Sequence, residues 1–417
     1  MARGLTLEDA RDYCIIGCVE PQKAGKTDGW HDAAFFNMCR PMELAFTNGY
    51  DKGKKIGPDT GDIADMKTFE EFYEAYKAQQ SYMIKLLVNA NNAIDMAHAI
   101  RCPLPFQSCM VEDCIGRGKS LQEGGAIYNF TGPQGFGIAN NTDGLVAIKK
   151  LVFEEKRFTL AELGEALKAN FGYGVHGAAA EKLTTEIATE LVASGVEVNE
   201  NAIRMIYDEV TNQTSLSASE KAKYKEIKRL IEEESPKYGN DIYDVDMFAR
   251  DVANSYTKEV EKYKNYRGGI FQAGLYPVSA NVPLGASTGA TPDGRKSGSP
   301  FSENQSPTYG ADRSGITALL KSLSKLPFAR TATGGLNLTF SQKPSSDVLR
   351  ALVLSYFELG GFHVGIGIVD RETLLDAMKN PEKYKSLTVR LYGFSEYFVS
   401  LPEWQQLAVL NRTEYKG

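Results

Sequence analysis

The chain has 417 residues, of which 42% are hydrophobic and 24% charged, and it contains 39 Gly and 16 Pro. These values are ordinary for a globular protein and exclude a disordered chain, a collagen-like repeat and a small disulfide-bonded scaffold. The length allows one large α/β barrel or about two to three domains. The formal net charge of −6 comes without any basic stripe, which argues against nucleic-acid binding and against attachment to an anionic membrane surface.

The sequence contains no apolar run near the roughly 18 residues of a membrane span. The first residues, MARGLTLEDARDY, lack the apolar core of a signal peptide. All six cysteines lie in the first 114 residues, and no C-x-x-C pair occurs. We therefore expect reduced thiols, a cytoplasmic location and no metal site.

The first half of the chain alternates apolar runs with helical patterns. Residues 13–21 form an apolar run closed by Pro, which predicts a buried strand that ends in a turn. Residues 66–100 predict a helix, residues 110–117 a short helix, residues 124–137 a Gly-rich segment and residues 141–155 a further helix. The expected apolar stripe of the long helix consists of Met83, Leu86, Leu87, Ala90, Ile94 and Ala97.

In the second half, residues 160–235 are helical in pattern and highly charged, whereas residues 265–315 are rich in Gly, Pro, Ser and Asn and predict long loops. Residues 352–370 predict a helix followed by a Gly-containing strand. Residues 389–399 alternate as a strand does, and a helix is expected around residues 404–411. Alternating strands and helices with long loops favour an α/β barrel.

Cys18 and Glu20 are two residues apart on a segment expected to be extended, so their side chains point to the same side. A thiol beside a carboxylate permits a nucleophile with a base, or a one-electron thiyl with a base. The alternative is a buried cysteine beside an unrelated surface carboxylate.

Residues 25–32, Gly-Lys-Thr-Asp-Gly-Trp-His-Asp, place His31 and Asp32 a short distance after this pair. The segment is either functional or an ordinary turn. A phosphate-binding loop is disfavoured because Glu20 stands where its first glycine is needed. The glycines of residues 132–137 do not follow the dinucleotide pattern, so close backbone packing is their expected use.

Two motifs at opposite ends, Gly-Cys-Val-Glu-Pro-Gln at residues 17–22 and Arg-x-x-Gly-Phe at residues 390–394, together resemble the glycyl radical enzymes. Tyr-Asn-Phe-Thr-Gly-Pro-Gln-Gly at residues 128–135 and Thr-Pro-Asp-Gly-Arg at residues 291–295 resemble the same family. The motifs follow the family's order over nearly the whole chain.

The resemblance implies an α/β fold, the C-terminal half of a ten-stranded β/α barrel in which two finger loops meet. It implies that Cys18 carries the thiyl and Gly393 the radical, installed by a radical S-adenosylmethionine activase with no bound cofactor. Glu20 is then the base that deprotonates a substrate hydroxyl. An oxygen-sensitive enzyme of anaerobic metabolism is expected.

The Cys-x-Glu arrangement resembles the family's eliminating branch, which includes diol and hydroxyproline dehydratases, choline trimethylamine-lyase and isethionate sulfite-lyase. A lyase or dehydratase that cleaves a C–O, C–N or C–S bond next to a hydroxyl-bearing carbon is therefore expected. Pyruvate formate-lyase proper has two adjacent cysteines, whereas Gly17 precedes Cys18 here; a formate C-acetyltransferase-like enzyme is the alternative. Asp32 and His31 are candidate substrate contacts. Arg267 either faces an anionic substrate group or serves as a loop anchor.

The expected division is a barrel portion at residues 1–288, with a helical insertion at about 173–230, and a glycyl radical domain at residues 289–417. Because family members have a long front portion, we expect that the isolated chain is unstable, needs a partner chain that carries the first half, or is a truncated gene product. Other expected partners are the activase, a small-molecule substrate and, in the full-length form, a second copy. The expected location is the cytoplasm or a bacterial microcompartment.

Two further hypotheses belong to other classes. One is a non-catalytic remnant or rescue subunit that supplies Gly393 to a damaged partner. The other is a hydrolase in which His31 activates Cys18, which leaves the Gly393 motif unexplained.

Overall fold

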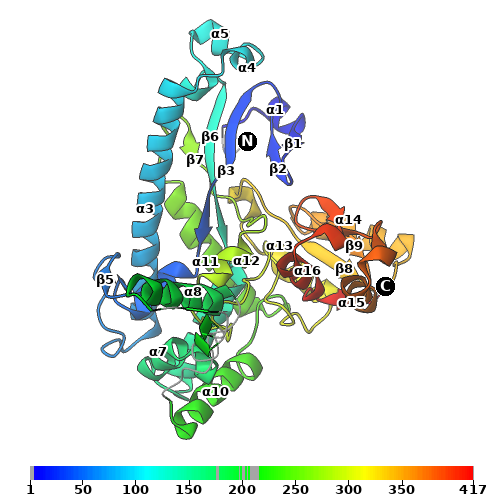
Figure 1. The fold of residues 1–417 in the computed structure, drawn as a ribbon. Coiled ribbons are helices and arrows are strands. Elements are labelled where there is room, and N and C mark those ends of the chain that lie inside the picture. Colours follow the sequence, from blue (N-terminus) through cyan, green and yellow to red (C-terminus); the bar gives the residue numbers. More distant parts are fainter. Residues whose placement is uncertain are drawn as a thin grey trace.

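The computed structural model describes residues 4–174, 178–196, 198–199, 202–203, 205–206 and 216–416. Its architecture is mixed α/β (Figure 1). The helices are α1 (Leu7–Arg11), α2 (Arg40–Phe46), α3 (Phe69–Arg101), α4 (Pro105–Cys109), α5 (Cys114–Arg117), α6 (Ile138–Ala147), α7 (Leu160–Lys168), α8 (Ala178–Ala193), α10 (Ala218–Glu233), α11 (Tyr243–Val260), α12 (Asn281–Ala286), α13 (Ile316–Ser324), α14 (Ser346–Glu358), α15 (Arg371–Lys379) and α16 (Glu403–Leu410). The strands are β1 (Cys14–Ile16), β2 (Glu20–Gln22), β3 (Thr27–Asn37), β4 (Tyr50–Asp51), β5 (Lys54–Lys55), β6 (Tyr128–Phe136), β7 (Ile270–Phe271), β8 (Asn337–Phe340), β9 (Gly365–Ile368), β10 (Thr388–Arg390), β11 (Ser395–Tyr397) and β12 (Glu414–Tyr415).

Two parallel sheets form the framework. One has the strand order β3-β6-β7 and the other β12-β8-β9. Parallel bridges from Gln134 to Gly274 and from Leu275 to Gly334 connect them. A Cβ at Gly274 would overlap the side chains of Gln134 and Thr333, so the glycine leaves room for these two buried groups. The α/β class expected from the sequence is confirmed.

The long helix α3 runs alongside β3 and β6 (Figure 1). It begins at the Thr68 capping box, in which Glu71 is the partner, and ends before Pro103. Its buried face consists of Phe69, Phe72, Ala75, Tyr76, Gln79, Gln80, Ile84, Val88, Asn91 and Asp95. The helix is therefore confirmed, but its expected apolar stripe is wrong as a core face, because Leu86 and Ile94 are about half exposed.

The run at residues 13–21 is not the expected buried strand. It forms the antiparallel hairpin of β1 and β2, with Cys14 opposite Gln22, and Ile15 is 54% exposed. Residues 389–399 are also a hairpin, formed by β10 and β11, with Gly393 in its turn. Two glycines of the segment at residues 124–137, Gly132 and Gly135, lie within β6. A Cβ at Gly132 would meet the His31 backbone and one at Gly135 the Tyr256 ring, so close packing explains these two.

The main core packs the parallel strands against α3, α6, α7, α10, α11 and α13. A smaller core lies under the β10–β11 hairpin and includes Val19, Tyr276, Leu391 and Tyr392. This second core joins the first hairpin to the C-terminal elements. Within 173–230, the expected insertion is helical in α8 and in α10, while residues 175–177, 197, 200–201, 204 and 207–215 lie outside the described residues. Of the helices in the described part of the chain, none has the length and hydropathy of a membrane-spanning segment.

Candidate active site

Cys18 lies at the tip of the β1–β2 hairpin, in the turn of residues 17–19. Gly17 has φ of +61°, a left-handed conformation that favours glycine. A Cβ there would also lie 2.6 Å from the Glu20 Oε2 atom. The turn that presents the thiol therefore requires glycine directly before it.

The Glu20 carboxylate folds back over this turn. Its Oε2 atom accepts hydrogen bonds from the backbone N–H of Cys18 at 2.6 Å and of Val19 at 2.8 Å. Burial raises the pKa of Glu20 above its ordinary value, the nearby charge of Asp32 adds to the rise, and the two N–H bonds oppose it. The result is a buried carboxylate beside the thiol, with a raised affinity for a proton.

Gly393 lies at the tip of the second hairpin and faces Cys18 directly. A Cβ built on Gly393 would lie 1.9 Å from Cys18 Cβ and 2.7 Å from Cys18 Sγ. No larger residue fits without moving one of the two hairpins. The fold thus places a Cα–H bond against a thiol, a geometry suited to moving a hydrogen atom between them.

Tyr276 adjoins Cys18 and was not identified from the sequence. Its ring is fully buried in the small core with Val19 and Leu391. Burial raises the pKa of Tyr276, and the neighbouring Cys18, Glu20 and Asp32 add to that rise. No local pattern marks this tyrosine, because only the fold brings the segment that follows β7 to the first hairpin.

His31 and Asp32 lie on β3, where the pairing with β6 is irregular between Trp30 and Ala34. The His31 ring is buried, and its Nε2 atom lies 3.4 Å from Gln22 Oε1. Burial lowers the pKa of His31 to about 4. The imidazole packs edge-on against the Phe130 ring, with its contacts directed to these groups rather than to the thiol. This arrangement disfavours a Cys18–His31 hydrolase.

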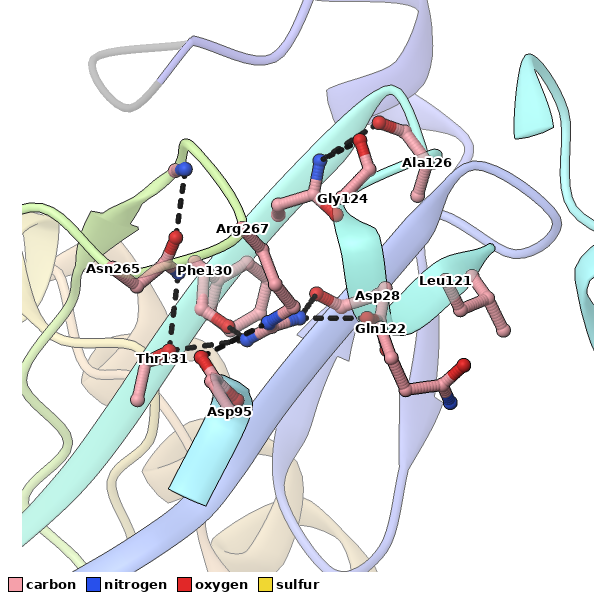
Figure 2. Close-up of polar contacts among 12 residues, drawn as sticks. Asp28, Asp95, Leu121, Gln122, Gly124, Ala126, Phe130, Thr131, Asn265 and Arg267 are labelled. Carbon is pink, nitrogen blue, oxygen red and sulfur yellow. Dashed lines mark hydrogen bonds and ion pairs between the residues drawn. The ribbon is translucent and has the colours of Figure 1, made fainter. Parts of the chain in front are cut away.

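Arg267 is enclosed by protein groups (Figure 2). Its Nε donates to Asp95 at 3.3 Å, and Nη1 donates to the carboxylate and the backbone carbonyl of Asp28, each at 2.7 Å. Its Nη2 donates to the Phe130 carbonyl at 2.8 Å and to Thr131 Oγ1 at 3.0 Å. All three guanidinium nitrogens are engaged, which favours the loop-anchor alternative over a substrate contact.

A cavity of about 680 Å³ opens beside the first hairpin. Its lining includes Cys18, Gln22, Phe130, Thr331 and His363 and is largely apolar. Of the predicted site residues, Cys18 is the one that reaches its wall. Among the residues described here, no cluster of three or more His, Cys, Asp or Glu side chains is arranged to hold a metal ion.

Two family models match the chain. The pyruvate formate lyase-like model covers residues 1–285 and the glycine radical model covers residues 301–399. Cys18 and Glu20 fall within the first match and Gly393 within the second.

Curated relatives include (2S)-3-sulfopropanediol dehydratase of Klebsiella oxytoca, 35% identical, with 99% of this chain and 46% of the relative covered. Another is trans-4-hydroxy-L-proline dehydratase of Clostridioides difficile, 33% identical, with 99% of this chain and 47% of the relative covered. The chain therefore spans about half the length of the curated relatives that it matches.

Solved structures are also similar. A protein of Roseburia inulinivorans studied for 1,2-propanediol dehydration has a TM-score of 0.90 and 50% identity, with 99% of this chain and 50% of that chain covered. The glycerol-bound, B12-independent glycerol dehydratase of Clostridium butyricum has a TM-score of 0.85 and 47% identity, with 100% of this chain and 47% of that chain covered.

Proposed function

This chain belongs to the pyruvate formate lyase-like family of glycyl radical enzymes, and we propose that it supplies the radical machinery of a dehydratase that acts on a small vicinal diol. The observation that carries the proposal is the contact between the two hairpin tips, where Gly393 lies against Cys18 and the Glu20 carboxylate lies beside the thiol.

The proposed cycle begins with a radical on the Gly393 Cα atom. This radical takes the hydrogen atom from the Cys18 thiol, and the resulting thiyl takes a hydrogen atom from the hydroxyl-bearing carbon C1 of the substrate. Gly393 has no side chain, so the distance between the two tips is as short as the backbone allows.

Glu20 then accepts the proton of the C1 hydroxyl. The C2–O bond breaks, and the departing hydroxide leaves as water with that proton, so Glu20 returns to its starting state. The remaining radical at C2 takes the hydrogen atom back from Cys18, and the thiyl left on Cys18 takes a hydrogen atom from Gly393, which restores the starting radical. The products are one aldehyde and one water. Burial raises the pKa of Glu20, which favours its role as a group that accepts this proton and then returns it.

A vicinal diol is favoured over the sulfonated, amino-acid or amine substrates of the branch. The two solved diol-related structures are 50% and 47% identical to this chain, against 35% and 33% for the sulfopropanediol and hydroxyproline enzymes. The Gly17 position supports elimination over acyl transfer, since its φ and its distance to Glu20 leave no room for a second cysteine side chain.

We further propose a radical S-adenosylmethionine activase and a complementary polypeptide as partners. The exposed apolar face of α3, with Leu86 at 49% and Ile94 at 46%, and the open cavity beside Cys18 are surfaces that such a polypeptide would cover. The same proposal includes a fold that is the C-terminal half of a ten-stranded barrel, divided near residue 288, with an insertion at 173–230 that carries no site. It also includes dimerisation of the full-length form and a cytoplasmic or microcompartment location.

The test is anaerobic incubation of the protein with an activase of this branch and S-adenosylmethionine, followed by electron paramagnetic resonance. A doublet signal is expected and, once the complementary polypeptide is added, so is propanal from 1,2-propanediol or 3-hydroxypropanal from glycerol. The variant Gly393→Ala should lose the doublet. The matched control Gly367→Ala should keep it, because the nearest atom to a Cβ there is 3.8 Å away. Absence of the doublet in the unaltered, activated protein would refute the radical function and favour a remnant.

A further inference from the structure

We propose that Glu303, Asn337 and Arg412 form a positioning clamp that holds the Gly393 hairpin against the Cys18 tip. The clamp touches neither substrate nor the reacting atoms. It acts through the two backbone carbonyls that lead into the radical turn, those of Arg390 and Leu391. The proposal deepens the proposed function and rests on it.

Arg412 is the centre of the clamp. Its Nη1 donates to the Arg390 carbonyl, and its Nη2 donates to the Leu391 carbonyl at 2.7 Å. The other edge of the guanidinium binds the Glu303 carboxylate, with Nε to Oε1 at 2.5 Å and Nη2 to Oε2 at 2.9 Å. A guanidinium has five N–H donors in a fixed planar fork, enough for two carbonyls and both carboxylate oxygens, whereas an ammonium group has three donors.

Asn337, the first residue of β8, completes the arrangement. Its Nδ2 donates to the Leu391 carbonyl at 2.8 Å and to Glu303 Oε2 at 2.9 Å. The Leu391 carbonyl thus accepts from two side chains that come from different parts of the chain. The side chains of Arg412 and Glu303 are 9% and 5% exposed, so their pairing is shielded from water.

The hydrogen bonds of Arg412 and Asn337 hold the β10–β11 hairpin to the rest of the fold, whereas bonds within the hairpin cannot do so. The Leu391 N–H donates to the Phe394 carbonyl at 2.9 Å, a bond within the turn that would travel with it. The apolar contacts of Leu391 and Tyr392 bury the turn but give it no fixed orientation. Hydrogen transfer depends on the distance between the tips, and a displacement of about 1 Å is enough to slow such a reaction strongly.

The variants are Arg412→Gln, Glu303→Gln and the conservative Arg412→Lys. The matched control is Arg371→Gln, because Arg371 also donates through Nη1 to a backbone carbonyl of this region, that of Leu410, but does not touch the radical turn. Two measurements are made on the purified protein: amide hydrogen exchange across residues 388–397, and turnover per glycyl spin counted by electron paramagnetic resonance.

Arg412→Gln and Glu303→Gln should speed amide exchange in the hairpin by roughly tenfold or more. Turnover per spin should fall while KM for the diol stays constant, and Arg412→Lys should lie between these variants and the unaltered protein. Unchanged exchange in both variants, or an equal change in Arg371→Gln, would overturn the clamp. Hydrogen exchange needs no radical, so it tests the clamp even if the unaltered protein gives no doublet. Absence of the doublet would count against the proposed function and not against the clamp. A variant that does not fold is replaced by Arg412→Lys, for which unchanged exchange and unchanged turnover per spin refute the proposal.

Discussion

Replacement of Arg267 by Met should destabilise the fold rather than impair substrate binding. The Arg267 side chain is 1% exposed, and its ion-pair partners Asp95 and Asp28 are 2% and 18% exposed. Removing one member of a buried charge pair costs about 3–5 kcal/mol, because the remaining carboxylates lose their partner without regaining water. Arg267 also ties α3, β3 and β6 together, so the loss is not local.

The destabilisation should depend on pH in a defined direction. Burial already raises the pKa of Asp28, and Arg267 opposes that rise. Without Arg267, the folded-state pKa of Asp28 rises further above its unfolded value. A group with a raised folded-state pKa contributes stability that is present at low pH and lost as pH increases. The free energy lost in Arg267→Met should therefore be smaller at pH 5 than at pH 7.5.

Urea unfolding at these two pH values, with KM measured in parallel, provides the assay. Arg229→Met is the control, because Arg229 makes ion pairs with Glu226 and Glu233 on the exposed surface of α10 and should leave unfolding nearly unchanged. Arg267→Lys keeps the charge but loses the forked geometry, so it should fall between the two. A loss below about 1 kcal/mol in Arg267→Met, together with a large rise in KM, would refute the anchor role and favour a substrate contact.

Three further outcomes are expected. Burial lowers the folded-state pKa of His31 from 6.5 to about 4. The contribution of His31 to the free energy of unfolding is therefore fully present above pH 6.5 and falls by up to about 3 kcal/mol as the pH decreases toward 4. Denaturation of His31→Gln should lack most of this pH dependence, and the control His98→Gln should retain it. Thr68→Ala should cost about 1 kcal/mol in thermal unfolding by removing the α3 cap, whereas an equal loss in Thr68→Ser would contradict the capping explanation. Glu20→Gln keeps an acceptor for the two turn N–H groups but no base, so it should accept the radical and form no aldehyde; near-normal aldehyde formation would exclude Glu20 as the base.

Local sequence patterns predict those helices and strands whose start and end signals lie within the element itself. The helix at residues 66–100 carries its own start signal at Thr68 and its own stop at Pro103, and the structure has α3 there. The α/β class followed from alternating elements in the same way. The apolar run at residues 13–21 predicts a buried strand, but its residues lie in the partly exposed β1–β2 hairpin, because an apolar run does not reveal what covers it.

The residues of the candidate site also fall into those that the sequence predicts and those that only the fold reveals. Cys18 and Gly393 were identified through motifs, and the contact between their two turns is visible only in the fold. Tyr276, Asn337 and Arg412 had no signal in the sequence, because each acts through a neighbour that is distant along the chain. For Arg267 the sequence allows either a contact to an anionic substrate group or a loop anchor, and its five contacts in the fold favour the anchor.

The proposed reactive pair, Cys18 and Gly393, lies on two short antiparallel hairpins near opposite ends of the described chain. Two-stranded hairpins are marginal on their own and open locally more readily than a central strand does. In the proposed cycle, a radical passes between Gly393 and Cys18 only while both hairpins are packed against the framework. The proposed turnover therefore requires both hairpins to be folded at the same time. If either hairpin opens, the radical stays on the residue that carries it at that moment.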